Sequence, residues 1–302
     1  MGIAIACVVL VAFTHHDAHS KTTKHAISCN AAPPCVFRTL VGLETFDTAA
    51  VHFDPNLTEV AIRNGLNWMV QAQQPNGGWG AGSHFNQQVT DPHAVPADPA
   101  ATAMVGMALL RTDEKPFEGP HAESLKKAVQ FLLAAVNNAA PRDINITTLT
   151  NTQPQTKLGK NIDVILTAQF LSNALPFVNN NNELKNDLKQ ALQKCIDKIQ
   201  RGQDVDGGWK DGGWAPVLQS ALANNALESA KENGAKVDTT VLEKSRTYQK
   251  GNYDTKTNSV VTGKAAGVLL YSVSSSARAS AKEAKVAKEK IVQAKKRRQA
   301  AG

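Results

Sequence analysis

Apolar residues recur at helical spacing along almost the whole chain from Leu57 onward, and no stretch alternates in the two-residue period of a strand. The pattern predicts helices that begin and end at ordinary signals, such as Asp98-Pro99 and Asn233-Gly234. The predicted helices are 57–73, 99–111, 122–137, 161–177, 182–199, 217–233, 239–249, 260–273 and 277–299. The chain is therefore predicted to be all-α.

These helices are of two kinds, which alternate along the chain. Helices such as 182–199 keep one apolar stripe and a charged back, as helices with one face toward solvent do. Helices such as 99–111, 161–177 and 217–233 are apolar on most sides and must be enclosed by other helices. The order of outer helix and inner helix repeats across residues 57–276, which predicts about four helical hairpins with inner and outer helices.

The composition is that of an ordinary soluble globular protein. Of the 302 residues, 42% are hydrophobic and 20% are charged, which excludes a disordered, collagen-like or multi-span membrane chain. The net charge of +7 comes from the last predicted helix, because residues 277–302 hold nine Lys and Arg against two Glu. The rest of the chain is neutral, so we expect no nucleic-acid partner.

The basic segment 277–302 is predicted to be a separate Ala/Lys-rich helix. Its apolar face is mostly Ala, which favours a solvated helix over one that lies on anionic lipid. A protein partner that binds this basic helix stays open as an alternative.

The beginning of the chain resembles a secretory signal. An apolar run from Gly2 to Phe13 is followed by Ala18-His19-Ser20, a small-x-small pattern, although no Lys or Arg precedes the run. The run is too short to span a bilayer, so we expect no transmembrane segment there. If the protein is exported, a disulfide between Cys29 and Cys35 is feasible, and two unpaired thiols are the alternative.

These features predict a secreted or periplasmic protein in four parts. The parts are a signal peptide at 1–20, an irregular leader at 21–56, a helical domain at 57–276 and the basic helix at 277–302.

Two loops that follow outer helices carry one motif: an aliphatic residue, three residues, Gln, three residues and Gly-Gly-Trp. The copies are Gln73, Gly77, Gly78 and Trp79, and Gln203, Gly207, Gly208 and Trp209. The motif resembles the Gln-Trp repeat of the squalene and terpenoid cyclases and the protein prenyltransferase β-subunits, whose shared fold is an α/α toroid. The resemblance covers residues 57 to about 276, and it implies a toroid or, with only four hairpins, a horseshoe-shaped partial toroid.

The motif residues suit structural tasks. Gly-Gly permits a backbone turn where a side chain would clash, Trp can fill the gap between hairpins, and the Gln amide can satisfy groups at helix ends. The motif therefore predicts architecture and leaves the chemistry open.

The chain also departs from those families. It has no Asp-x-Asp-Asp tetrad, no Asp, Cys and His set for zinc and no Cys-Gly-x-Gln thioester motif. Three Tyr and four Trp are too few to wall a cavity that stabilises carbocations. No cofactor and no defined metal motif is predicted, although a divalent metal stays open.

The long connection from Trp79 to Asp98 is the most unusual segment, and such loops are often functional. We expect it to reach the mouth of a cavity and to supply the candidate catalytic residues His84, Asp91, His93 and Asp98. His and carboxylate groups can act as general acid and base or bind a divalent metal. The alternative is that Asp98 is a helix cap, Asp91 opens a turn and His84 lies on the surface.

Further candidates line the expected central cavity. They are Met104, Met107, Asp163, Gln169 and Asn173. Inward-facing Met side chains would favour a hydrophobic ligand, and inward-facing Gln and Asn would favour a sugar. For Asp163, attraction to the helix dipole is the simpler explanation. Carboxylates near Trp209 and Trp214 suggest a calcium or sugar site, although Asp-Gly turns account for them as well.

Three functions remain open on the sequence alone. The first is binding of a hydrophobic or glycan ligand in the helical cavity without the catalytic residues of the resembled families. The second is a glycan-active lyase or hydrolase on the same scaffold. The third is a structural or interaction module of the cell envelope. Whether the protein is an enzyme stays undecided at this point.

Overall fold

The computed structural model describes residues 55–300. The chain divides into two compact units, residues 1–65 and 66–302, and helix α3 (Pro55–Gln71) runs from the first into the second. The expected signal peptide, most of the expected leader, and Cys29 and Cys35 lie outside the described residues.

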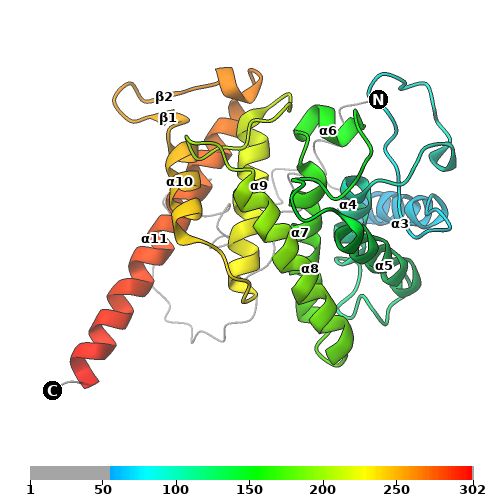
Figure 1. Cartoon of the computed structure of the whole chain (residues 1–302), viewed down its shortest axis with the longest axis horizontal. Coiled ribbons are helices and arrows are strands. Elements are labelled where there is room, and N and C mark those ends of the chain that lie inside the picture. Colours follow the sequence, from blue (N-terminus) through cyan, green and yellow to red (C-terminus); the bar gives the residue numbers. More distant parts are fainter. Residues whose placement is uncertain (1–54, 301–302) are drawn as a thin grey trace. The chain divides into compact units, whose positions relative to one another are not determined.

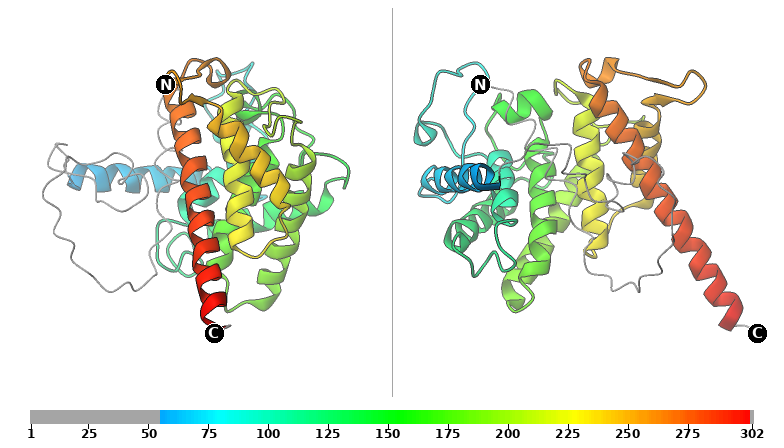
Figure 2. Two further views of the ribbon diagram at one scale, coloured as in Figure 1. Left: turned by 90° about the vertical axis from the view of Figure 1, so that its left-hand side faces the viewer. Right: turned by 180° about the vertical axis from the view of Figure 1, so that it is seen from behind.

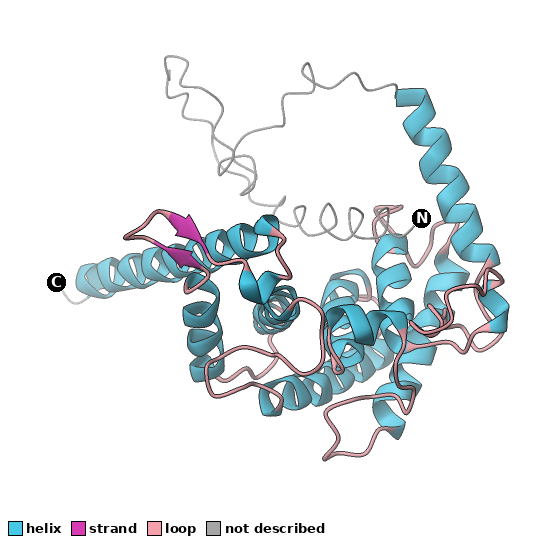
Figure 3. Cartoon of the chain, turned by 90° about the horizontal axis from the view of Figure 1, so that it is seen from above, coloured by secondary structure: helices cyan, strands magenta, loops and turns pink. Residues whose placement is uncertain are grey.

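In the described part of the second unit, all regular secondary structure is helical except for one short hairpin, and loops connect the elements (Figures 1 and 3). Its further α-helices are α4 (Pro99–Leu109), α5 (Ala122–Asn138), α6 (Gln153–Leu158), α7 (Ile162–Ala174), α8 (Asn182–Arg201), α9 (Pro216–Glu232), α10 (Thr239–Lys250) and α11 (Leu269–Ala300). The 3-10 helices are η2 (Pro92–Ala94), η3 (Leu175–Phe177) and η4 (Gly263–Ala265), and strands β1 (Tyr253–Asp254) and β2 (Ser259–Val260) pair antiparallel. The prediction of an all-α protein is confirmed.

Inner and outer helices alternate along the second unit. In the inner row, α4 packs on α7, α7 on α9 and α9 on α11 (Figure 1). On the outer side, α5 packs on α4, α8 packs on α7, and α5 and α8 contact each other. Helix α10 packs on α9 and α11. A closed toroid is not confirmed.

Helix α7 lies at the centre of the core. All of its residues except Asn173 are buried, although its sequence includes four polar side chains besides Asn173. Gly106 permits its close approach to α4, because a Cβ atom at Gly106 would lie 2.6 Å from the ring of Phe170. The expectation that this apolar helix is enclosed is confirmed.

The C-terminal part differs from the prediction of helices at 260–273 and 277–299. The β1–β2 hairpin and η4 precede one continuous helix, α11, which begins at Leu269 (Figure 2). Ala266 and Gly267 have φ angles of 50° and 76°, so the backbone cannot be helical there. No Gly or Pro lies within α11, so the two predicted helices join and the predicted break is wrong.

Periodicity also fails to predict α6, because this helix has only six residues. A capping box starts it: Thr152 accepts a hydrogen bond from the backbone N–H of Gln155, whose side chain accepts one from the backbone N–H of Thr152. Pro154 occupies the first turn, where its missing N–H is not needed. Within residues 55–300, no helix is long and apolar enough to cross a membrane.

Candidate functional site

The two Gly-Gly-Trp loops make matching hydrogen bonds through their Gln side chains. Gln73 Nε2 donates hydrogen bonds to Gly77 O at 2.9 Å and to Ser124 O of α5 at 2.8 Å. Gln203 Nε2 donates hydrogen bonds to Gly207 O at 3.1 Å and to Val241 O of α10 at 2.9 Å. In both copies the Gln amide thus joins its loop to the next outer helix.

The two Trp side chains also have matching environments. Trp79 and Trp209 are buried, and each indole N–H donates to a carbonyl of the preceding outer helix, at 2.7 Å and 2.9 Å. Their backbone N–H groups donate to hydroxyls of the following inner helices, Thr102 Oγ1 at 3.0 Å and Ser220 Oγ at 2.9 Å. Each Trp therefore joins an outer helix to an inner helix.

The first glycine of each motif is required for two reasons. Gly77 and Gly207 have φ angles of 88° and 90°, which other residues rarely adopt. A Cβ atom would lie 2.5 Å from Lys127 O in the first copy and 2.3 Å from Lys244 O in the second. The motif residues thus take part in contacts between helices, and the functional site must be sought elsewhere.

The copies differ in the segment that follows Trp. In the second copy, six residues separate Trp209 from α9. In the first copy, the long loop 80–98 separates Trp79 from α4. This loop lies against residues 149–152 through a bridge between Ser83 and Thr152. The two segments enclose a pocket of about 210 Å³, lined by Gly82, Ser83, Asn86, Val89, Ala94, Val95, Pro96, Asp98, Leu149, Thr150 and Thr152.

Asp98 is the carboxylate among the residues that line this pocket. It is 2% exposed and caps α4, because its Oδ1 accepts from Ala101 N at 2.9 Å. Its Oδ2 accepts a longer hydrogen bond, 3.4 Å, from Ala81 N. Burial raises the pKa of Asp98, while these backbone N–H groups act in the opposite direction. Asp98 therefore combines the expected cap with a place in the pocket wall.

The other three candidate catalytic residues are not among those that line the pocket. His84 Nδ1 lies 3.1 Å from Gln153 Oε1. Asp91 caps η2 by accepting from His93 N at 2.9 Å, and the His93 ring lies 3.5 Å from the Asp91 carboxylate on the exposed surface. Within residues 55–300, no three His, Cys, Asp or Glu side chains are grouped to hold a metal. The expected gathering of all four at one cavity mouth is therefore not observed.

Asp163 is a second buried carboxylate, near the N-terminus of α7. Its Oδ2 accepts from Ile146 N at 2.7 Å, and its Oδ1 accepts from Asn145 Nδ2 at 3.4 Å. Burial and, to a smaller degree, the negative charge of Asp98 raise the pKa of Asp163 to about 7, against the lowering effect of the backbone hydrogen bonds. Asp163 thus holds Asn145 and Ile146 in place. These two residues begin the segment that continues to residues 149–152 in the pocket wall.

Two of the expected ligand residues on the inner helices, Gln169 and Asn173, contact each other. Gln169 Oε1 accepts from Asn225 Nδ2 at 2.5 Å, and Gln169 Nε2 donates to Asn173 Oδ1 at 3.1 Å. On α4, Met107 is buried and Met104 is half-buried. The Gln169 amide thus links α7 to α9, and both its oxygen and its nitrogen already form hydrogen bonds within the protein.

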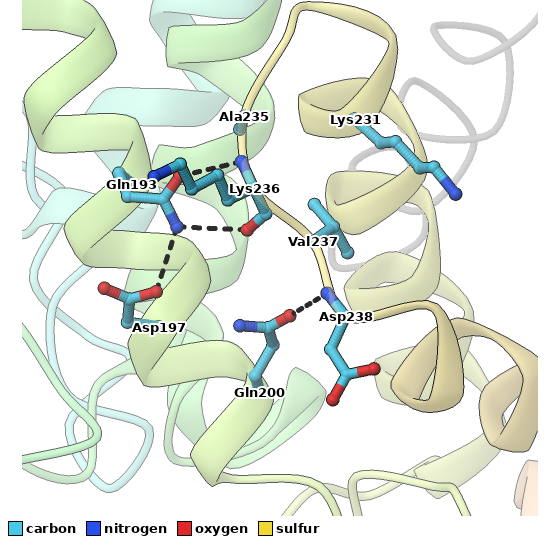
Figure 4. A pocket seen from close by; sticks show the side chains of 8 residues that line it. All are labelled: Gln193, Asp197, Gln200, Lys231, Ala235, Lys236, Val237 and Asp238. Carbon is cyan, nitrogen blue, oxygen red and sulfur yellow. Dashed lines mark hydrogen bonds between the residues drawn. The ribbon is translucent and has the colours of Figure 1, made fainter.

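A larger open groove of about 670 Å³ lies between α8 and the connection from α9 to α10 (Figure 4). Gln193 Oε1 accepts from Lys236 N at 2.8 Å, and its Nε2 donates to Lys236 O at 3.0 Å. Gln200 Oε1 accepts from Asp238 N at 2.7 Å. These amides hold the connection against α8, so the smaller and more enclosed pocket at Asp98 is the better candidate site.

Asp98 is identifiable from the sequence, whereas the opposite wall of the pocket is not. Leu149, Thr150 and Thr152 belong to a segment that periodicity marks only as a connection. The capping box of Thr152 and Gln155 was the available signal that this segment is ordered.

Comparison with known proteins adds no assignment to this geometry. No family model, curated protein or solved structure matches the chain. Function must therefore be argued from the pocket itself.

Proposed function

We propose that the protein binds a small, hydroxyl-rich ligand, a single sugar unit, in the pocket between loop 80–98 and residues 149–152. The observation that carries the proposal is the buried Asp98 carboxylate in the wall of a half-open pocket. Both of its oxygens accept backbone N–H groups, and a carboxylate oxygen has a further lone pair that can accept a ligand hydroxyl.

The rest of the lining fits the same chemistry. Ser83, Thr150 and Thr152 supply hydroxyls and Asn86 supplies an amide, while Val and Pro side chains supply apolar surface. Binding pockets of this kind combine apolar walls with a few polar groups that orient the ligand. A volume of about 210 Å³ corresponds to roughly seven water molecules at the volume water has in the liquid. This favours a ligand of monosaccharide size.

Binding is favoured over catalysis at this pocket. A lyase or hydrolase needs a second acid or base that can reach the substrate, and the pocket lining contains one carboxylate and no His. The scaffold we propose is a partial toroid of the prenyltransferase/squalene cyclase repeat class, supported by the matching contacts of the two Gly-Gly-Trp loops. Export remains part of the proposal, on the resemblance of residues 1–20 to a signal.

The proposal is tested by titrating the full chain with glucose, N-acetylglucosamine and galacturonate, using ligand-observed NMR and calorimetry. We expect binding of a neutral sugar in the millimolar range. Asp98→Asn keeps a good helix cap but loses the charged acceptor, so it should weaken binding by about tenfold or more. Asp91→Asn, at an exposed cap outside the pocket, is the matched control.

Two results would overturn the proposal. One is the absence of binding by all three sugars, and the other is equal affinity for wild type and Asp98→Asn. Should Asp98→Asn fail to fold, Thr150→Val changes the opposite wall without removing a cap, and it should also weaken binding.

A second candidate function is an interaction through the end of α11. All residues from Ala287 to Gln299 are exposed, and they include six Lys and Arg against one Glu. This arrangement favours an acidic protein partner for the end of α11. A pull-down with α11 cut after Val286 tests this idea, because a partner that binds this segment must be lost.

A further inference from the structure

Helix α6 connects the pocket to an exposed aromatic side chain. Its N-cap residue, Thr152, lines the pocket. In its last turn, Lys157 Nζ lies 5.8 Å from the centre of the Trp214 ring. Lys157 is five positions after Thr152 along the chain, which corresponds to a helical rise of about 7.5 Å. The pocket and Trp214 thus flank the two ends of one short helix.

Trp214 differs from the two motif tryptophans. It is 52% exposed, whereas Trp79 and Trp209 are 4% and 0% exposed. Tyr271 of α11 packs edge-on against it, with the ring centres 6.5 Å apart. An indole that is held by a neighbouring ring and half open to solvent can offer a flat apolar surface to a ligand.

The loop that carries Trp214 is fixed on the connection between α6 and α7. Lys160 N donates to Asp211 O at 2.8 Å, and the Lys160 ammonium lies 3.1 Å from the Asp211 carboxylate. Gly213 is required for close packing, because a Cβ atom there would lie 2.8 Å from Gly159 N. Trp214 therefore has a defined position relative to α6.

We propose that Trp214 forms a second sugar subsite, so that the protein binds a neutral oligosaccharide that extends from the pocket along α6. The apolar C–H face of a pyranose unit would stack on the indole, and the Lys157 ammonium would donate to hydroxyl oxygens of the same unit. This inference rests on the proposed function, since the first unit occupies the pocket at Asp98.

Exposed aromatic surface also occurs at the other end of α6. Phe85, next to the pocket residues Ser83 and Asn86, is 79% exposed, and its ring packs edge-on against that of His84. Aromatic side chains thus also occur in loop 80–98, which forms one wall of the pocket. This distribution fits an extended ligand better than a single small molecule.

The test is a series of calorimetric titrations with oligomers of one to four units, using β-linked glucose, α-linked glucose and β-linked N-acetylglucosamine. In at least one series, the affinity of wild type should rise by about tenfold between one unit and three. Trp214→Ala should remove this increase and leave the affinity for the single unit unchanged. Trp68→Ala, which removes another exposed tryptophan (59% exposed), is the matched control.

Each outcome separates this inference from the proposed function. If no single unit binds, the proposed function fails. If single units bind but affinity does not rise with length, or the rise survives in Trp214→Ala, the second subsite is wrong. Trp214→Phe keeps a flat ring and should retain most of the increase, which distinguishes stacking from a general effect of the substitution on folding.

Discussion

The negative charge of the buried Asp98 carboxylate, at the N-terminus of α4, contributes to the raised pKa of Asp163, near the N-terminus of α7. The pKa of Asp163 is raised to about 7, mainly by burial and further by the negative charge of Asp98. Each carboxylate accepts a backbone N–H from the loop beside it, Ala81 N for Asp98 and Ile146 N for Asp163. The two walls of the pocket are thus each attached to a buried acid.

The raised pKa of Asp163 predicts a dependence of stability on pH. The folded pKa of Asp163 lies above the ordinary value of 3.8, so the folded state binds this proton more tightly than the unfolded state. The stabilising contribution is complete below about pH 4 and is lost as the pH rises to about 7. Relative to Asp163→Asn, wild type should lose about 2–4 kcal/mol of unfolding free energy between pH 4.5 and pH 8. Urea unfolding at both pH values measures the difference.

The control for this experiment is Asp187→Asn, at an exposed position of α8. Its pH dependence should follow that of wild type. A constant difference between wild type and Asp163→Asn across the pH range would show that Asp163 does not titrate in this way.

The glycines of the motif give a second prediction. Gly77→Ala and Gly207→Ala combine a positive φ angle with a close approach to a carbonyl oxygen, so each should lower the unfolding free energy by more than about 2 kcal/mol. Gly234→Ala is the matched control, because Gly234 has a φ angle of 85° but no atom within 4 Å of the added Cβ. It should cost only about 1 kcal/mol, from the backbone conformation alone. Equal losses at all three positions in chemical denaturation would argue against tight loop packing.

The Gln side chains of the motif give a third prediction. Gln73→Met and Gln203→Met keep the length of the side chain but remove both hydrogen bonds of each amide, so each should cost about 1–3 kcal/mol. Gln87→Met, at an exposed position of loop 80–98, should stay within about 0.5 kcal/mol of wild type. If the motif variants were as stable as this control, the junction between loop and outer helix would not contribute to stability.

A buried ion pair gives a fourth prediction. Arg246 Nε of α10 donates to Glu228 Oε1 of α9 at 2.8 Å, and both side chains are 8% exposed. Glu228→Gln leaves the guanidinium without its carboxylate and should lower the unfolding free energy by about 3–5 kcal/mol. Glu123→Gln breaks the exposed pair with Lys127 and should cost less than about 1 kcal/mol. Thermal and urea unfolding of the two variants give the comparison.

The sequence predicted helices well wherever a long apolar pattern lies between clear caps. Helix α7 is an example, since its run from Ile162 to Leu171 is buried as expected. The pattern failed where one or two residues decide the conformation. Ala266 adopts a left-handed conformation that its side chain does not predict, and this turn moves the start of the last helix to Leu269.

The site was harder to predict than the fold, because it depends on contacts between distant segments. Asp98 could be identified from the long loop that precedes it. That Ser83 pairs with Thr152 and thereby closes a pocket is decided by tertiary packing. His84 and His93 are not among the residues that line the pocket, although their proximity in sequence to Asp98 suggested a shared site.

The measurement that tests the central claim most directly is a map of backbone amide chemical shifts on addition of the neutral sugar that binds most tightly. Ligand in the pocket should perturb the amides of Gly82, Asn86, Thr150 and Thr152, from both walls, and leave Lys236 and Asp238 in the open groove unchanged. Perturbations confined to the open groove, or to neither wall of the pocket, would contradict the account.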